Sequence, residues 1–165
     1  MNAPFEIVPM GRADFDRFWP AFEAIVVAGE TYAWDRDLDA DAARVLWLDT
    51  PLQTWAARTN AGDVLGSYYL KANAGGGGAH VCNCGFMTAP EARGRGVAGR
   101  LCQHAQDAAR DAGLRAMQFN AVVSTNTGAI ALWQRQGFEI VGRVPGGFDH
   151  PEAGEVDLLI MHKRL

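Results

Sequence analysis

The sequence predicts a mixed α/β domain in which one twisted sheet carries helices on both faces. Segments with helical periodicity alternate with short β-prone segments, and no linker or internal repeat divides the 165 residues. Hydrophobic residues make up 48% of the chain and charged residues 21%, which is typical of soluble globular proteins. We therefore expect residues 1–165 to form a single domain that needs no disulfide and no metal to fold.

The first part of the chain is expected to form a short strand followed by two helices. Residues 5–9 are β-prone, and from Asp14 apolar residues recur at helical spacing until Gly29, which ends the first helix. A second helix is predicted over residues 39–48. The aromatic and acidic segment 30–35 connects the two helices.

A hairpin and a third strand are predicted next. Residues 54–59 and 64–70 are β-prone, and the segment Asn60-Ala61-Gly62-Asp63 between them is a hairpin signal. The third strand is expected over residues 80–88. The glycines at positions 75–78 favour no single structure, so they predict a mobile connection before that strand.

In the second half of the chain, helices alternate with strands. Gly113 and Gly137 each follow a segment of helical periodicity and are expected to end a helix. The predicted elements are, in order, a helix over residues 96–112, a strand over 114–123, a helix over 126–136 and strands over 138–144 and 155–161.

The charge and the cysteine content of the chain indicate which partners it does not bind and in which compartment it is expected. The net charge of −4 and the pI near 5.5 predict no binding to nucleic acid and none to a membrane. No apolar run reaches the roughly 18 residues of a membrane span, and residues 1–10 lack the pattern of a signal peptide, so we expect a cytoplasmic protein. The three cysteines, an odd number without metal-site spacing, are expected to be reduced core residues.

Residues 93–100, Arg-Gly-Arg-Gly-Val-Ala-Gly-Arg, lie where a predicted strand gives way to a helix. Glycines there let successive backbone N–H groups point at an anion, and a helix N-terminus adds roughly half a positive charge. Arg93, Arg95 and Arg100 add side-chain charge suited to phosphate. The segment therefore suits a diphosphate, although a glycine-rich turn before a basic helix also fits, and neither the P-loop nor the Rossmann pattern is met.

The same segment resembles the acetyl-CoA signature of the GCN5-related N-acetyltransferase (GNAT) superfamily, which is Arg or Gln, two residues, Gly, one residue, then Gly or Ala. Arg93, Gly96 and Ala98 match it, and residues 126–138 resemble the family's segment of Asn, Ala, Leu-Tyr and Gly-Phe. The resemblance implies a single twisted, mostly antiparallel sheet of six to seven strands. It also implies acetyl-CoA as the cosubstrate.

The resemblance further implies which residues bind this cosubstrate. The strand residues Phe86, Met87 and Thr88 would offer backbone groups to the pantetheine arm and the thioester. Asn126 would contact the arm, and it also suits the N-cap of its own helix. The residues implied to hold the pyrophosphate are Arg93, Gly94, Arg95, Gly96, Val97, Ala98, Gly99 and Arg100.

Trp133 departs from the family's pattern. Many members have a tyrosine at this place, which protonates the departing thiolate, and an indole cannot act as a general acid. Trp133 either orients the sulfur through its N–H or packs as a core aromatic beside Phe138. A water molecule, Tyr32, Tyr68 or Tyr69 would then supply the proton.

The general base and the acceptor site are less defined by the sequence. An α-amine with a pKa of about 8 needs less help in losing a proton than a lysine side chain with a pKa of about 10.4. Each acidic or histidine candidate could equally be a surface residue without a catalytic role. The candidates for the base or for acceptor recognition are Glu30, Asp35, His150 and Glu155.

Asn83 is a further catalytic candidate. Strand alternation puts its side chain on the opposite face from Cys82, Cys84 and Phe86, in an expected central strand where a buried amide needs a hydrogen-bond partner. The stretch His-Val-Cys-Asn also resembles the branch that contains yeast proline-analogue acetyltransferases. That branch implies an asparagine that positions the substrate or the thioester; the alternative is a satisfied core asparagine.

From these features we expect an acetyl-CoA-dependent N-acetyltransferase that modifies the primary or secondary amine of a small molecule, an amino acid or analogue, by direct attack in a ternary complex. Segments 30–35 and 146–150 would line the acceptor pocket. A protein N-terminal acetyltransferase, with residues 145–154 forming a peptide groove, and a non-catalytic acyl-CoA-binding module remain alternatives. We expect a monomer or a homodimer.

Overall fold

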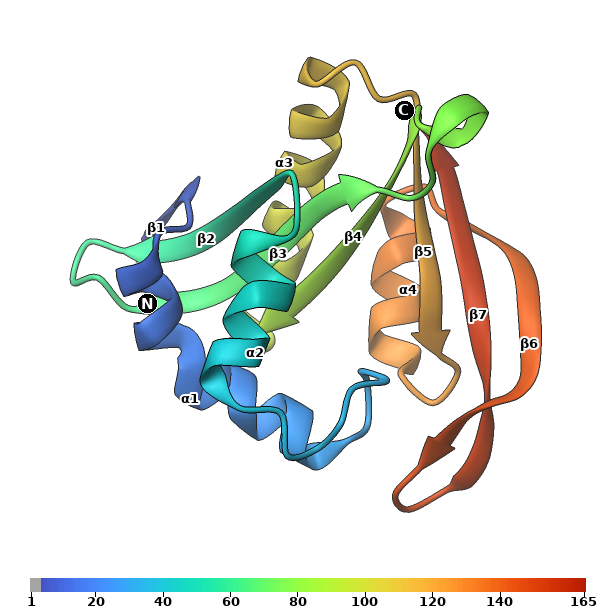
Figure 1. Ribbon diagram of the computed structural model, residues 1–165, viewed down its shortest axis with the longest axis horizontal. Helices are drawn as coiled ribbons and strands as arrows, with labels where there is room; N and C mark the ends of the chain where they lie inside the picture. Colours follow the sequence, from blue (N-terminus) through green and yellow to red (C-terminus); the bar gives the residue numbers. More distant parts are fainter. Residues whose placement is uncertain (1–3) are drawn as a thin grey trace.

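The computed structural model describes residues 4–165 and confirms the predicted fold class. Its sheet has seven strands in the order β1-β2-β3-β4-β5-β7-β6, in which β4 and β5 are parallel and every other neighbouring pair is antiparallel (Figure 1). The strands are β1 (Phe5–Pro9), β2 (Gln53–Thr59), β3 (Val64–Ala72), β4 (Val81–Thr88), β5 (Ala116–Val123), β6 (Glu139–His150) and β7 (Gly154–Arg164).

The helices follow the capping signals in the sequence. Gly29 takes a left-handed conformation (φ 66°) after α1, and the side chain of Asn126 accepts a hydrogen bond from the N–H of Ala129 at 3.3 Å as α4 begins. The helices are α1 (Arg12–Ala28), α2 (Ala40–Arg44), α3 (Val97–Asp111) and α4 (Thr127–Arg135), with 3₁₀ turns at Gly76–Gly78 and Pro90–Ala92.

Helices cover both faces of the sheet, but not evenly. On one face, α1 and the segment after α2 pack on the first strands, where the indole N–H of Trp47 donates to the hydroxyl of Ser67 at 2.9 Å. On the other face, Val97 and Leu101 of α3 pack against Gly66 of β3. Figure 1 shows α1 and α2 in front of β2 and β3, whereas no helix lies in front of β5 and β7.

Several predicted elements differ in extent, among them β7, which runs on to Arg164, whereas the sequence predicts an end at Met161. The second helix continues past α2 as a π-helix over Val45–Asp49, so it ends one residue beyond the predicted boundary. Strand β6 runs on to His150, whereas the sequence predicts an end at Val144. The loop signal of residues 145–147 is a β-bulge, after which Phe148 pairs with Val156.

The remaining expectations concern the glycine segment and the cysteines. Residues 76–78 form a 3₁₀ turn, with the N–H of Gly78 donating to the carbonyl of Gly75, and the mobility of this connection stays a prediction. All three cysteines are buried, as predicted. Among residues 4–165, no helix combines the length and the apolar character needed to cross a membrane.

Candidate active site

Strands β4 and β5 separate soon after they meet. They pair at Val81 with Ala116, Cys82 with Met117 and Asn83 with Gln118, and there the pairing ends. Both strands continue, to Thr88 and Val123, along diverging paths (Figure 1). The backbone of β4 beyond Asn83 therefore has one edge that faces no neighbouring strand.

The direction of the backbone groups on β4 follows from the antiparallel ladder with β3. The N–H of Ala89 donates to the carbonyl of Leu65, and in such a ladder every second residue points to the same neighbour. Met87 thus faces β3, while Phe86 and Thr88 face the open edge. The backbone groups of Met87 are therefore used inside the sheet, and its contact with the cosubstrate stays a prediction.

The loop before α3 presents a run of unbonded donors. The N–H groups of residues 94–99 have no acceptor in the part of the chain that the structure describes. Gly94 and Gly96 have φ values of 73° and 76°, and a Cβ atom on either would meet open space. Donors without partners at a helix N-terminus, on bare backbone, form a site that fits a diphosphate.

The arginines around this loop differ in what they contact. Arg93 is exposed and Arg95 half-buried, and neither forms an ion pair with any residue from 4 to 165. The guanidinium of Arg100 instead lies 4.0 Å from the ring centre of Phe5 and donates to the carbonyl of Phe5 at 3.4 Å. In this conformation the side chain of Arg100 contacts β1, and its phosphate contact stays a prediction.

Aromatic rings close the separated strands on the side of α3 and α4. The ring of Phe86 lies 5.4 Å from that of Tyr68, 5.8 Å from that of Phe119 and 5.0 Å from that of Trp133. Trp133 is only 8% exposed and also packs on Phe119 at 5.1 Å. Trp133 therefore forms the apolar bottom of the site, called the floor below, next to the open edge of β4.

Tyr32 approaches the same edge from the opposite face. Its hydroxyl donates to the carbonyl of Phe86 at 2.8 Å, and its ring stacks on Trp34 at 4.6 Å. Burial, reinforced by Tyr69, holds the pKa of Tyr32 well above its ordinary value. The hydroxyl is therefore a neutral donor, placed where β4 exposes its backbone.

Asn83 occupies the point at which the strands part. As predicted, its side chain is buried and lies on the opposite face from Cys82. Its Nδ2 donates to the carbonyl of Gln118 at 2.9 Å, and its Oδ1 accepts from the hydroxyl of Tyr69 at 3.4 Å. The buried amide of Asn83 is therefore hydrogen-bonded through both its nitrogen and its oxygen. Its catalytic role stays a prediction.

The ring of Tyr69 covers the next position on β4. A Cβ on Gly85 would lie 2.5 Å from a carbon of that ring, so only glycine admits this contact. Burial raises the pKa of Tyr69 to about 12, which keeps its hydroxyl protonated. Tyr69 thereby joins Tyr32 and Asn83 around the start of the open edge.

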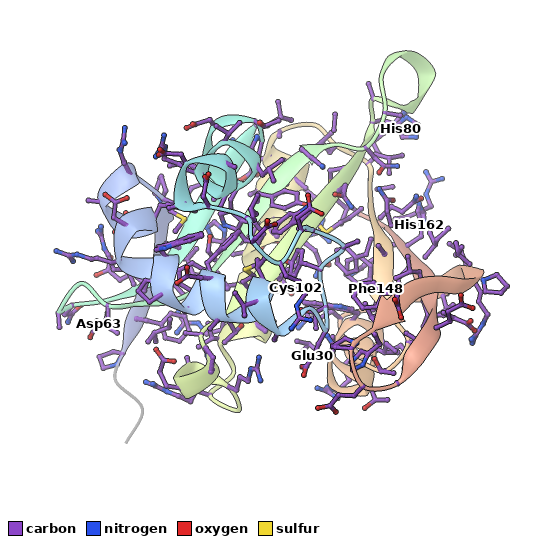
Figure 2. The ribbon with its side chains drawn as sticks, turned by 60° about the horizontal axis from the view of Figure 1, so that its bottom comes forward. Glu30, Asp63, His80, Cys102, Phe148 and His162 are labelled. Carbon is purple, nitrogen blue, oxygen red and sulfur yellow. The ribbon has the colours of Figure 1, made fainter. Side chains whose placement is uncertain are left out.

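The two other predicted catalytic residues lie on surrounding segments. Glu30 is exposed directly after Gly29, and the loop that carries it lies at the same end of the molecule as the β6–β7 hairpin (Figures 1 and 2). The Nδ1 atom of His150 accepts the N–H groups of Glu152 and Ala153, each at 3.2 Å. In this conformation Nδ1 of His150 accepts hydrogen bonds within the hairpin turn, and the catalytic role of His150 stays a prediction.

Sequence reasoning missed a set of amides beside Asn83. The side chain of Gln118 donates to that of Asn120 at 2.9 Å, and Asn120 donates to Asn73 at 2.7 Å. Strand alternation alone places Gln118 on the same face as Asn120. The contact with Asn73 depends on strand register and has no local signal.

Comparison with known proteins identifies relatives of this fold and loop. The profile of the acetyltransferase (GNAT) family matches residues 15–138. A GCN5-related N-acetyltransferase from Kribbella flavida, of solved structure, is 47% identical with a TM-score of 0.92, over 98% of each chain. A GNAT superfamily phosphinothricin acetyltransferase from Sinorhizobium meliloti, solved in complex with AcCoA, has a TM-score of 0.87 at 19% identity, over 98% of this chain and 88% of that one.

A curated relative matches over a shorter stretch. The N-acetyltransferase aca1 of Schizosaccharomyces pombe is 35% identical over 79 residues, which are 48% of this chain and 38% of that protein. The match therefore spans well under half the length of this relative.

Proposed function

Because this chain belongs to the acetyltransferase (GNAT) family, whose cosubstrate is acetyl-CoA, we propose that it acetylates the amine of a small molecule, an amino acid or analogue. The observation that carries the proposal is the run of unbonded N–H groups at residues 94–99, next to the open edge of β4. When bound, acetyl-CoA supplies an acetyl group activated as a thioester. The chain's own residues bind the cosubstrate, orient the two reactants and exclude water from the site.

Each part of the site has a separate task in this proposal. The N–H groups of residues 94–99, with Arg93 and Arg95, hold the diphosphate. The backbone of Phe86 and Thr88 aligns the extended arm, and N–H groups at this edge stabilise negative charge that develops on a carbonyl oxygen held there. Trp133 keeps water from the floor of the site.

Stabilisation of the departing sulfur is assigned to the face that carries Tyr32. A small α-amine is partly neutral near pH 7, so it needs no strong base. The hydroxyl of Tyr32 is protonated and lies at the open edge, so it donates a hydrogen bond to the departing sulfur in place of the tyrosine that is missing at Trp133. Asn83 orients the reacting groups at the strand separation.

The size of the acceptor is inferred from the aromatic loop. The bond from Tyr32 to Phe86 and the stacking of Trp34 bring the α1–α2 loop onto the β4 edge. An extended peptide needs an open groove at that place, whereas a small amine does not. The S. meliloti relative is named a phosphinothricin acetyltransferase, and by analogy this name also favours a small acceptor.

The function is tested by following the release of free thiol from acetyl-CoA with three classes of acceptor: free amino acids, aminoglycosides and short peptides. Release with free amino acids is the expected result. Release with peptides alone would replace the proposed acceptor by a protein N-terminus. Binding of acetyl-CoA without release for any amine would leave only an acyl-CoA-binding module.

Replacing Tyr32 by phenylalanine should lower kcat by about 3- to 10-fold and leave the fold intact, because one hydrogen bond to the departing sulfur is lost. Tyr68→Phe is the matched control, since its hydroxyl contacts Nδ1 of His104 at 2.8 Å, away from the open edge. Equal kcat losses in both variants would remove Tyr32 from the mechanism. Steady-state kinetics and thermal melting give the two readouts.

A further inference from the structure

One face of the sheet carries a continuous line of polar side chains that no helix covers. Strand register places Lys71 opposite Asn83, Asn83 opposite Gln118, Gln118 opposite His162 and His162 opposite Glu139. Cross-strand partners share a face, so these five residues, here called the polar row, cross five adjacent strands. Apart from Asn83 they are exposed or half-buried.

The polar row reaches the candidate active site at Lys71. The ammonium of Lys71 lies 5.3 Å from the ring centre of Tyr69, and that ring covers Gly85, the residue before Phe86. Asn83, the next residue of the row, marks the point at which β4 leaves β5. The row therefore begins within a side chain's length of the open edge.

The charges at the two ends of the polar row are opposite and far apart. Lys71 forms no ion pair with any residue of the described chain. Glu139 lies four strands away, about 19 Å at the usual strand spacing, which exceeds the screening length of roughly 8 Å at physiological salt. The end of the row beside the active site is consequently positive.

The amides of Gln118, Asn120 and Asn73 lie on the same face of the sheet as Lys71 and have mostly donors left. Asn120 and Asn73 use their side-chain oxygens as acceptors for Gln118 and Asn120, respectively. The second N–H of Gln118, the second N–H of Asn120 and both N–H groups of Asn73 have no acceptor among residues 4–165. Free donors on the same face of the sheet as an unpaired ammonium suit an anion that accepts several hydrogen bonds, such as a carboxylate.

We propose that Lys71, together with the amides of Asn73, Gln118 and Asn120, binds the carboxylate of the acceptor, so that Lys71 sets a preference for amino acids over amines without an acid group. The inference rests on the proposed function, because it names the chemistry of the acceptor at that same site. The amine of such an acceptor then lies toward Gly85 and Phe86. Lys71 is a specificity residue and takes no part in proton transfer.

The preference is measured as the ratio of kcat/KM for an amino acid to kcat/KM for its primary amide, over several side chains. In Lys71→Met this ratio should fall about 10-fold or more, the usual effect of losing a charged hydrogen bond. Lys71→Arg should retain most of the preference. Arg12→Met, which removes an exposed positive charge at the start of α1, is the control and should keep the full ratio.

A binding measurement separates this inference from the proposed function. Calorimetric titration of amino acids into protein saturated with CoA, where no transfer takes place, should give a Kd about 10-fold or more weaker for Lys71→Met, and the difference should shrink at high salt. An unchanged Kd, or an unchanged ratio of kcat/KM, overturns the role of Lys71. Thiol release with amines but without a preference for the acid group leaves the acetyltransferase function standing and overturns the carboxylate site alone.

Discussion

Gly96→Val should abolish measurable binding of acetyl-CoA, with a Kd at least about 100-fold weaker, while the domain stays folded. A β-branched residue at φ 76° is strained, so the loop relaxes and turns its N–H groups away from the anion. The cost to the free energy of unfolding is roughly 1–3 kcal/mol. Calorimetry with acetyl-CoA and a thermal melt measure the two effects separately.

Gly113→Val is the matched control for this change. Gly113 has the same φ of 76°, and a Cβ there also meets open space, but it lies just beyond the other end of α3. The two variants should lose similar stability, and only Gly96→Val should lose acetyl-CoA. Normal binding by Gly96→Val would show that the loop before α3 is not the diphosphate site.

Gly66→Ala should destabilise the domain by about 1–3 kcal/mol, the usual cost of overpacking. The new Cβ would lie 2.8 Å from the carbonyl oxygen of Met87, 3.1 Å from Val97 and 3.2 Å from Leu101. A backbone carbonyl inside a ladder cannot move aside, so the first turn of α3 has to shift. Because that turn carries the diphosphate donors, acetyl-CoA should also bind about 10-fold more weakly.

Gly128→Ala tests whether the loss comes from packing. Gly128 lies in the first turn of α4, and a Cβ there has no neighbour within 4 Å, so alanine should be neutral or stabilising by up to about 1 kcal/mol. Denaturant unfolding compares the two variants. A Gly66→Ala protein as stable as Gly128→Ala would mean that α3 does not pack on β3 as described.

The order of the elements was predictable from the sequence because its signals are local. Gly29 ends the helical periodicity that begins at Asp14, and Asn126 caps the helix that it starts. Each of these two signals lies within a few residues of the helix end that it marks. The length of β6 was not predictable. Proline and two glycines at residues 145–147 predict a loop, and only pairing with β7 shows that the strand resumes at Phe148.

The candidate site was predictable where the backbone itself is the functional group. The glycine pattern at residues 94–99 by itself implies backbone donors without intrachain partners. Long-range contacts were not predictable, since the bond from Tyr32 to Phe86 joins residues 54 positions apart, and Arg100 meets Phe5 across 95 positions. The separation of β4 from β5 depends on the register between the two strands, and the sequence of neither strand alone predicts that register.

The one-sided pairing of β4 has a consequence for solvent exchange. The amide of Met87 is held in the ladder with β3, whereas those of Phe86 and Thr88 face the edge that β5 has left. Hydrogen exchange in the free protein should therefore be slow at Met87 and fast at its two neighbours, although all three belong to one strand. Occupation of the edge should slow the exchange at Phe86 and Thr88 and remove this alternation.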